Sequence, residues 1–351
     1  MHNTNLIVIN GRFLSQRLTG IQRFAYEICC ALKQIGVPIV ILAPNNIDPH
    51  YNIQDLPVIP IGGQGSHFWE QVTLPRYMRK HYNGRILLSL SGFSPLCYNR
   101  NILTIHDISY LLRPRSYSWL YCTYYRLLTP LIAKRAKKIL TVSNFSKDEL
   151  IHILHLPAEK IEVVYNAVRP APLLPQTTQD RFILAVGSQV PRKNLKRLFE
   201  AYCSMPKPDF DLYLAGGTHA IYANAELTPY QNRKGVHLLD YVHDKDLAQL
   251  YRNATAFVNP SLYEGFGIPN IEAMQQHCPL VVSDIPAFRE VCGEAALYFD
   301  PTNIADIQAK LDQIMHDEAL RQQLADKGDK QCLRFDWNQS AQVIQSVINT
   351  L

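Results

Sequence analysis

The sequence predicts an α/β protein of two domains, each built around a parallel β-sheet. Three observations support this: the length, the alternation of short apolar runs with longer amphipathic stretches, and one break in that alternation. At 351 residues the chain is longer than one hydrophobic core usually supports. Strands that alternate with helices are typical of parallel sheets. The break lies in a proline-containing stretch, so it separates two units of the same kind.

In the first half, short apolar runs predict buried strands at 6–9, 38–42, 85–90, 102–105, 138–142 and 161–165. Helices are expected at 21–34, 68–80, 117–136 and 145–154. Ser143 stands before the last of these helices and is a plausible N-cap. The N-terminus lacks the basic start and apolar core of a secretory signal, which favours a first strand there.

In the second half, strands are expected at 182–187, 210–217, 236–239, 255–258, 279–283 and 296–299. Helices are expected between them and at about 303–332 and 337–350. This pattern gives two Rossmann-like domains, 1–166 and 181–335, a linker at 167–180 and a C-terminal helix within 336–351. Two such domains facing across a cleft bring the carboxyl ends of both sheets together, where open α/β sheets bind ligands.

Composition indicates a soluble globular protein, with 47% hydrophobic and 19% charged residues. No apolar run approaches the roughly 18 residues of a membrane-spanning helix. The eight cysteines are scattered and form no CxxC pair, which argues against a zinc site and favours reduced thiols in a cytoplasmic protein.

Charge is distributed unevenly between the halves. Residues 1–166 hold 18 Lys and Arg against 9 Asp and Glu, whereas residues 167–351 hold 17 against 21. Basic clusters lie on the expected helices at 76–81 and 131–138, and aromatic residues surround the first cluster. The first half is therefore expected to meet an anionic partner, such as a phosphate-bearing acceptor or a membrane surface. Solvated helix faces are the alternative interpretation.

The segment 259–273 contains the strongest chemical signal. Glu264 and Glu272 are separated by seven residues, one in a glycine-containing loop and one on the helix expected to begin near Pro269. Free N–H groups at Gly265, at Gly267 and at the helix start can bind anions or sugar hydroxyls. The two carboxylates can each accept hydrogen bonds from a vicinal diol. A glycine-rich turn with a solvated glutamate is the alternative for an isolated pair.

A second segment, 186–195, places Arg192 and Lys193 after a strand, where they are expected to open a helix. Cations oppose the helix dipole at that position, so their presence favours an anionic ligand such as a diphosphate over a solvated basic turn.

Two weaker signals lie in the first domain. His106 and Asp107 follow the strand at 102–105, where the histidine can act on a ligand and Asp107 can orient it or its loop. Gly20 ends the loop before the first helix, where backbone N–H groups can face a phosphate. A structural role is the alternative for His106. The absence of a GxGxxG string weakens a dinucleotide-dehydrogenase interpretation.

Over essentially its whole length, the chain resembles glycosyltransferase family 4, a large retaining family with the GT-B fold. The strings that carry the resemblance are TGIQRFAYEI, ILTIHDISYL, ILTVSNFSKDEL, VVYNAV, VGSQVPRKNL, VNPSLYEGFGIPNIEAM and FDWNQSA. The pattern is most similar to the bacterial branch that builds O-antigen and capsule, in which many members are described as mannosyltransferases.

The resemblance implies roles for individual residues. Glu264 would contact the donor sugar beside the amides of Gly265, Phe266 and Gly267, and Glu272 would hold the ribose. Lys193, with Arg192 adjacent, would bind the diphosphate, and His106 would be the active-site histidine. Gly20 would belong to the glycine loop of the first domain, while Tyr241 and Val242 would lie against the nucleotide base. The final helix would pack back on the first domain, as it does in relatives.

Four departures from the family pattern fall on Ser188, Ala167, Asp240 and the single glycine before the first helix. Ser188 replaces a common arginine, which shifts the expected diphosphate contact towards Arg192. None of the departures removes an expected catalytic group, so the resemblance implies an active enzyme.

The resemblance further implies transfer with retention and without a metal or other cofactor. The expected donor is GDP-mannose and the expected acceptor a saccharide, free or linked to polyprenyl diphosphate. The expected place is the cytoplasm, peripheral on the inner face of the membrane, and no nucleic-acid partner is expected. Alternatives are a UDP- or dTDP-sugar donor, a nucleotide-sugar epimerase, a phosphorylase-like enzyme and a non-catalytic sugar-nucleotide-binding subunit.

Overall fold

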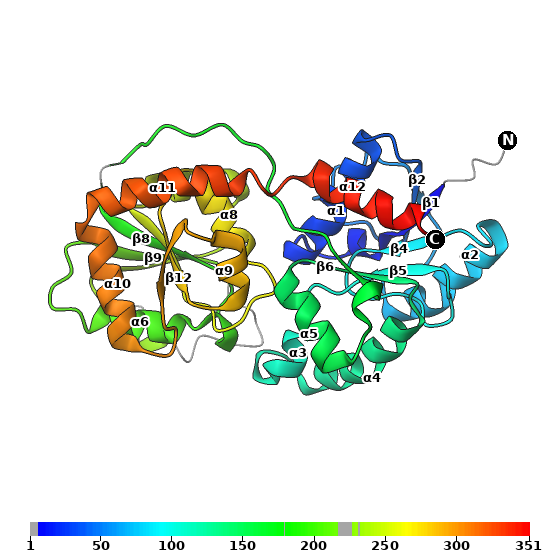
Figure 1. The fold of residues 1–351 in the computed structure, drawn as a ribbon, viewed down its shortest axis with the longest axis horizontal. Coiled ribbons are helices and arrows are strands. Elements are labelled where there is room, and N and C mark those ends of the chain that lie inside the picture. Colours follow the sequence, from blue (N-terminus) through cyan, green and yellow to red (C-terminus); the bar gives the residue numbers. More distant parts are fainter. Residues whose placement is uncertain (1–5, 179, 217–226, 231) are drawn as a thin grey trace. The chain divides into compact units, whose positions relative to one another are not determined.

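The computed structural model describes residues 6–178, 180–216, 227–230 and 232–351 (Figure 1). The chain divides into two compact units, one formed by 1–167 with 335–351 and the other by 168–334. At the start of the second unit, residues 168–178 form neither helix nor strand. The expected linker residue 179 and the last residue of the expected strand 210–217 lie outside the described residues.

The first unit contains a seven-stranded parallel sheet in the order β3-β2-β1-β4-β5-β6-β7. Its strands are β1 Ile7–Asn10, β2 Ile39–Ala43, β3 Val58–Pro60, β4 Leu87–Ser89, β5 Asn101–Thr104, β6 Lys138–Thr141 and β7 Ile161–Val163. Its α-helices are α1 Gly20–Gln34, α2 Leu74–His81, α3 Ser109–Leu112, α4 Trp119–Arg135, α5 Asn144–Leu154 and α12 Trp337–Asn349. The expected α/β architecture with parallel strands is confirmed.

The C-terminal helix α12 packs against α1 within this first unit (Figure 1). The indole of Trp337 meets the ring of Phe24 edge-on, with centroids 5.9 Å apart. Ser340 donates a hydrogen bond of 2.8 Å to the carbonyl of Tyr165. The last helix therefore completes the core of the unit that begins the chain.

The second unit contains a six-stranded parallel sheet in the order β10-β9-β8-β11-β12-β13. Its strands are β8 Phe182–Val186, β9 Asp211–Ala215, β10 Val236–Leu239, β11 Ala256–Asn259, β12 Leu280–Ser283 and β13 Ala296–Phe299. Its α-helices are α6 Leu195–Cys203, α7 Asp244–Asn253, α8 Ile268–Gln275, α9 Pro286–Cys292, α10 Ile304–His316 and α11 Glu318–Cys332.

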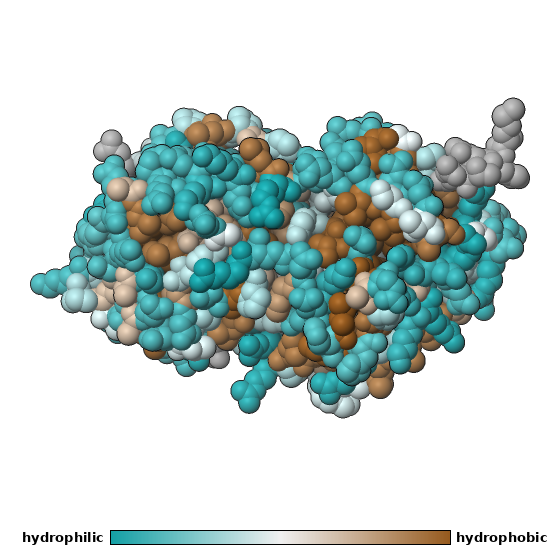
Figure 2. Space-filling model, viewed as in Figure 1, coloured by the Kyte–Doolittle hydropathy of each residue, from teal (hydrophilic) through white to brown (hydrophobic). Residues whose placement is uncertain are grey.

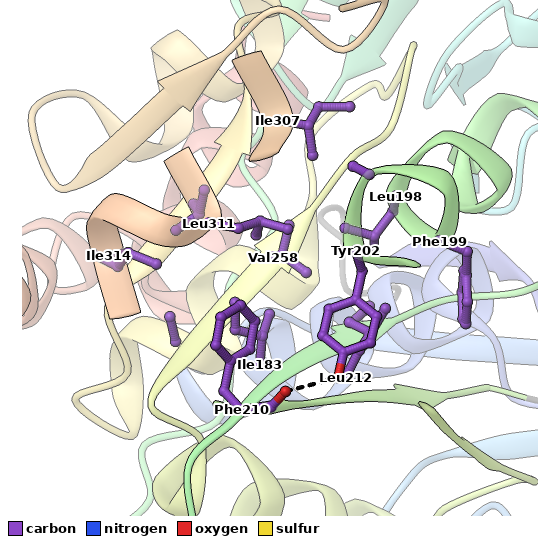
Figure 3. Close-up of a cluster of buried hydrophobic side chains, with 14 of the residues drawn as sticks. Ile183, Leu198, Phe199, Tyr202, Phe210, Leu212, Val258, Ile307, Leu311 and Ile314 are labelled. Atoms are coloured by element: carbon purple, nitrogen blue, oxygen red, sulfur yellow. Dashed lines mark hydrogen bonds between the residues drawn. The ribbon is translucent and has the colours of Figure 1, made fainter. Parts of the chain in front are cut away.

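Alternate residues of the central strands build the core on one face of this second sheet, as the two-residue period of a strand requires. Ile183, Leu212 and Val258 pack there against α6 and α10 (Figure 3). Tyr202 of α6 lies in the same cluster, and its hydroxyl donates a 2.7 Å hydrogen bond to the carbonyl of Phe210 (Figure 3). Strands β8 and β11 pair side by side in this sheet, and the loops after them contain the residues described next.

Candidate functional site

Glu264 lies in the loop between β11 and α8 and is buried beside two cations. Its Oε1 atom lies 3.0 Å from Nη1 of Arg192, forms an ion pair with Lys193 and accepts a 3.1 Å hydrogen bond from Ser261. Burial alone raises the pKa of Glu264, but Lys193, Arg192 and the hydrogen bonds outweigh burial and lower the pKa to about 2. Glu264 is therefore a carboxylate at any physiological pH.

Arg192 and Lys193 reach Glu264 because β8 and β11 are neighbours in the sheet. The carboxyl ends of two adjacent parallel strands lie at the same edge, so the loops after them meet. A backbone hydrogen bond of 2.8 Å from Leu262 N to the carbonyl of Arg192 joins the two loops directly. Two cations therefore face one buried carboxylate at this edge of the sheet, and lysine and arginine side chains suit an anionic ligand.

The expectation that Arg192 and Lys193 open an α-helix is wrong. They lie in a short 3₁₀ turn, Pro191–Lys193, and α6 begins only at Leu195. Asn194 separates the two elements because it adopts a left-handed conformation with φ of 55°. The cost against the α6 dipole that we inferred from the sequence is therefore absent. The case for an anionic ligand depends instead on the two cations that meet at Glu264.

The glycine segment after Glu264 leads directly into α8. Gly267 is the N-cap of that helix with φ of +101°, a conformation that residues other than glycine rarely adopt. A Cβ atom at this position would also lie 2.6 Å from the ring of Phe288. The helix begins at Ile268, one residue before the expected Pro269, and Gly265 and Phe266 are buried beside it.

Glu272 lies on α8, as expected, and has a different environment from Glu264. Its Oε2 atom accepts a 3.0 Å hydrogen bond from the hydroxyl of Tyr251, whose pKa burial raises well above its ordinary value. Tyr251 is buried whereas Glu272 is partly exposed. The two glutamates of this segment are thus distinguished by their partners: cations for Glu264, a phenol for Glu272.

His106 follows β5 in the first unit and is buried. Its Nε2 atom lies 2.9 Å from the carbonyl oxygen of Leu90, and its ring meets Phe24 edge-on at 4.9 Å. Burial lowers the pKa of His106, against the opposing effects of Leu90 and Asp107, so the neutral ring donates from Nε2. Asp107 accepts hydrogen bonds from the backbone and side chain of Ser109, so these contacts orient the loop rather than the histidine.

The other expected residues are placed as follows. Gly20 is the first residue of α1 and is exposed, and Thr19 before it makes no side-chain cap. Tyr241 and Val242 follow β10; Tyr241 is exposed and its ring meets that of His243 edge-on. The structure thus brings Arg192, Lys193 and Glu264 into contact, and it places Gly20 and His106 in the other unit.

A buried polar network in the first unit was not anticipated from the sequence. Glu70 is fully buried; it accepts a 2.7 Å hydrogen bond from Asn10 and pairs with Arg12 at 3.0 Å. His67 lies 3.4 Å from the guanidinium, and burial followed by repulsion from Arg12 lowers its pKa to about 4. The network lies at the carboxyl ends of β1 and β4, since Ser89 also contacts Asn10. The one feature of the sequence that could have indicated this network is the position of Asn10, directly after an expected strand.

Among the described residues, one group of three side chains has the spacing of metal ligands: His277, Asp326 and Asp329. Its carboxylates are exposed, and His277 already pairs with Asp329 at 2.9 Å and contacts Gln322. These contacts are hydrogen-bond contacts at the surface, and the group lies on the turn after α8 and on α11.

Two family models match the chain. The one described as "Glycosyltransferase Family 4" covers residues 18–171, and the one described as "Glycosyl transferases group 1" covers residues 174–331. The chain is 33% identical over 280 residues to an O-antigen chain mannosyltransferase B of Escherichia coli, spanning 74% of this chain and 72% of that protein. It is 32% identical over 241 residues to the O-antigen chain mannosyltransferase RfbU of Salmonella typhimurium, spanning 68% and 67%.

Similarity to solved structures extends over nearly the whole chain. The Anabaena protein Alr3699/HepE, solved in complex with UDP and glucose, superposes with a TM-score of 0.75 over 99% of this chain and 100% of that protein. The two sequences are only 16% identical, so this likeness concerns the fold. It agrees with the two parallel sheets seen here.

Proposed function

The chain belongs to glycosyltransferase family 4 and has its GT-B architecture of two Rossmann-like domains, and from this premise we propose a specific reaction. We propose that the enzyme transfers mannose from GDP-mannose, with retention and without a metal, to a growing cell-surface polysaccharide. The observation that carries the proposal is the cluster that the buried Glu264 forms with the partly exposed Arg192 and Lys193. The names of the two enterobacterial relatives support mannose as the sugar.

The cluster suggests how the donor binds. In the free protein Glu264 neutralises part of the charge on Arg192 and Lys193. A donor diphosphate can take over these cations, since phosphate oxygens are good partners for lysine and arginine. Glu264 would then accept hydrogen bonds from the mannose hydroxyls, beside the amides of Gly265, Phe266 and Gly267. Glu272 would hold the ribose, and Tyr241 and Val242 would lie against the base.

The chemical step follows from the same groups. As the sugar–phosphate bond breaks, negative charge builds on the leaving diphosphate, and Arg192 and Lys193 stabilise it without a metal ion. An oxocarbenium-like sugar is then attacked on the face that the diphosphate leaves, and the diphosphate accepts the proton of the acceptor hydroxyl. His106 would contact the transferring sugar, and the N–H groups near Gly20 would face the phosphates. The neutral ring of His106 suits a hydrogen-bonding role better than that of a cation.

The acceptor is proposed to be a saccharide carried on polyprenyl diphosphate, bound by the first unit. That unit contains most of the excess positive charge of the chain. Because such acceptors are held in a bilayer, we propose that the enzyme works in the cytoplasm at the inner face of the membrane. No helix among the described residues is long and apolar enough to span a membrane.

The base of the donor is the point to test first, because HepE was solved with UDP whereas the two closely matching relatives are named as mannosyltransferases. Titration calorimetry with GDP, UDP, dTDP and ADP should rank GDP first. NMR of the product formed from GDP-α-mannose should show an α-linkage. Tighter binding of UDP or dTDP would transfer the proposal to another donor, and binding without turnover would favour a non-catalytic subunit.

A further inference from the structure

Helix α4, Trp119–Arg135, has apolar residues on two opposite faces. Its buried face contains Cys122, Thr129, Ile132 and Ala133, which pack into the core of the first unit. Leu127 and Leu131 follow Leu120 by seven and eleven residues, which is about two and three helical turns. The three leucines therefore form a stripe on the other face. Soluble helices usually present polar residues on that side.

This outer stripe is exposed in the structure. The exposed fractions are 75% for Trp119, 72% for Leu120, 64% for Leu127 and 51% for Leu131. Figure 2 shows apolar side chains emerging among hydrophilic ones over the part of the first unit that α4 occupies in Figure 1. Single exposed leucines are common, but several on one helix face are typical of a surface that binds another apolar body.

The charge around the stripe indicates what that body is. From Ile108 to Lys147 the sequence contains no Asp or Glu, yet it contains eight Lys and Arg. Arg126 and Lys134 are exposed on α4 itself, and Arg113 and Arg115 are exposed in the segment before it. At the end of α4, Arg135 and Lys137 line a hollow of about 480 Å³ together with Cys97 and Asn99. The charged residues of α4 itself are all cations, and exposed tryptophan and leucine beside cations match an anionic membrane interface.

We propose that α4 is a membrane-contact helix: Trp119 and the stripe of Leu120, Leu127 and Leu131 enter the interface of an anionic bilayer while the surrounding cations bind lipid phosphates. The proposal deepens the proposed function, because it names the surface through which the enzyme reaches a lipid-linked acceptor. It also favours α4 over α2 as the contact. The basic residues of α2 are exposed, but Arg79 donates to the carbonyl of Cys97 and the exposed apolar residue near that helix is a single Phe68.

The tryptophans provide a direct test. The chain has three, and Trp69 and Trp337 are only 1% and 7% exposed, so Trp119 is the one that a lipid can reach. Vesicles of phosphatidylcholine with phosphatidylglycerol should shift the tryptophan emission to the blue, and bromine-labelled lipid acyl chains should quench it. Trp119→Phe should abolish both effects. Vesicles of phosphatidylcholine alone should bind the protein at least about tenfold more weakly, and salt should weaken binding to the anionic vesicles.

Variants distinguish vesicle binding through the stripe from nonspecific adsorption to vesicles. Replacing Leu120, Leu127 and Leu131 together with Gln should reduce vesicle flotation at least about tenfold, because interfacial binding scales with the buried apolar area. A matched control is Leu333→Gln, since Leu333 is 76% exposed but lies in the second unit; it should bind as the wild type does. Arg126→Gln with Lys134→Gln should weaken binding to anionic vesicles and leave weak binding to neutral ones unchanged. Circular dichroism of each variant should match the wild type.

Three results would overturn the inference: no shift of Trp119 on anionic vesicles, equal flotation of the leucine variant and the wild type, or a stripe-dependent dimer in sedimentation velocity. The last result would identify the stripe as a contact between two copies. Donor binding measured without vesicles keeps the proposed function separate. Vesicle binding with no affinity for any nucleotide diphosphate would contradict the proposed function alone, and normal donor affinity without vesicle binding would contradict this inference alone.

Discussion

Arg192 and Glu264 are 72 positions apart in the sequence, yet Nη1 of Arg192 lies 3.0 Å from Oε1 of the buried Glu264. The contact exists because the strands that precede the two residues are neighbours in one parallel sheet. It holds the expected phosphate-binding cation against the expected sugar-binding carboxylate before any donor arrives. The predictions below begin with this pair.

Arg192→Ala and Lys193→Ala should each weaken donor binding by tenfold or more and leave the fold intact. Each removes a cation that we propose for the diphosphate, and a charged hydrogen bond of this kind contributes about 1.5–3 kcal/mol. Lys196→Ala is the control, since Lys196 is exposed on α6 and its ion pair with Glu200 is long at 4.0 Å. Calorimetric titration with GDP and GDP-mannose checks this. Unchanged affinity in both variants would remove the phosphate assignment.

The acid stability of the protein should depend on Glu264. Its pKa is about 2 in the folded state and near the ordinary 4.5 when unfolded. A carboxylate with a lowered pKa stabilises the fold above the unfolded pKa, and this contribution is lost as pH falls through the folded pKa. The shift corresponds to about 3 kcal/mol. Urea unfolding at several pH values should therefore show the difference between wild type and Glu264→Gln shrinking from pH ~5 towards pH ~2. A constant difference would mean that the ion pairs do not lower this pKa.

The Arg12–Glu70 pair should be far more strongly coupled than an exposed pair of equal length. Glu70→Gln leaves a buried guanidinium without its carboxylate, which typically costs about 3–5 kcal/mol. Lys327 and Glu294 form the matched control, because their ion pair of 3.1 Å lies in solvent. Double-mutant cycles from urea unfolding should give a coupling of at most about 1 kcal/mol for the exposed pair. Similar couplings for both pairs would show that Glu70 is not buried as described.

Chelation of divalent metals should leave most of the activity intact. Arg192 and Lys193 provide the positive charge that a metal would otherwise bring to the leaving diphosphate. Assays with and without EDTA, on enzyme freed of bound metal beforehand, measure this. Complete loss that only Mn²⁺ or Mg²⁺ restores would contradict the metal-independent mechanism and would direct attention to the carboxylates near the donor.

Short apolar runs located strands well even where the strand is only partly buried, as in β10 and β13. The runs 236–239 and 296–299 match β10 and β13 residue for residue. The strand β3, Val58–Pro60, was missed because it is a short edge strand that is mostly exposed and ends in proline. The single helix expected over 303–332 is two helices, because Asp317 caps the start of α11 through Leu320 N. An aspartate at an N-cap position is a sequence signal for the start of a helix, so this division could have been predicted.

Part of the candidate site could also be predicted from the sequence, and part could not. Glu264, Lys193 and Arg192 stand in sequence motifs that are specific enough to identify them as candidate site residues. Their pairing depends on the order of strands in the sheet, which apolar runs do not encode. The same reason hid Glu70, a lone glutamate whose partners, Asn10 and Arg12, lie about sixty residues away in the chain.

Glu264→Gln and Glu272→Gln should separate in steady-state kinetics. Glu264 is proposed to face the transferring sugar, where charge develops in the transition state. Its amide should lower kcat strongly, by about 2–4 kcal/mol of transition-state stabilisation. Glu272 is proposed to hold the ribose, and its contribution is common to the ground and transition states. Its amide should therefore raise KM and affect kcat less. The amide can still accept the hydrogen bond from Tyr251, so the fold is expected to persist.

Binding of the bare nucleotide diphosphate makes the same distinction without turnover, because that ligand lacks the sugar. Glu264→Gln releases Arg192 and Lys193 from the carboxylate that pairs with both in the free protein. This variant should bind GDP at least as tightly as the wild type, whereas Glu272→Gln should bind it poorly. Glu294→Gln, which changes an exposed carboxylate in the same unit, should match the wild type in both assays. If calorimetry gives the reverse order, the two glutamates exchange roles: Glu264 then serves the nucleotide and Glu272 the sugar.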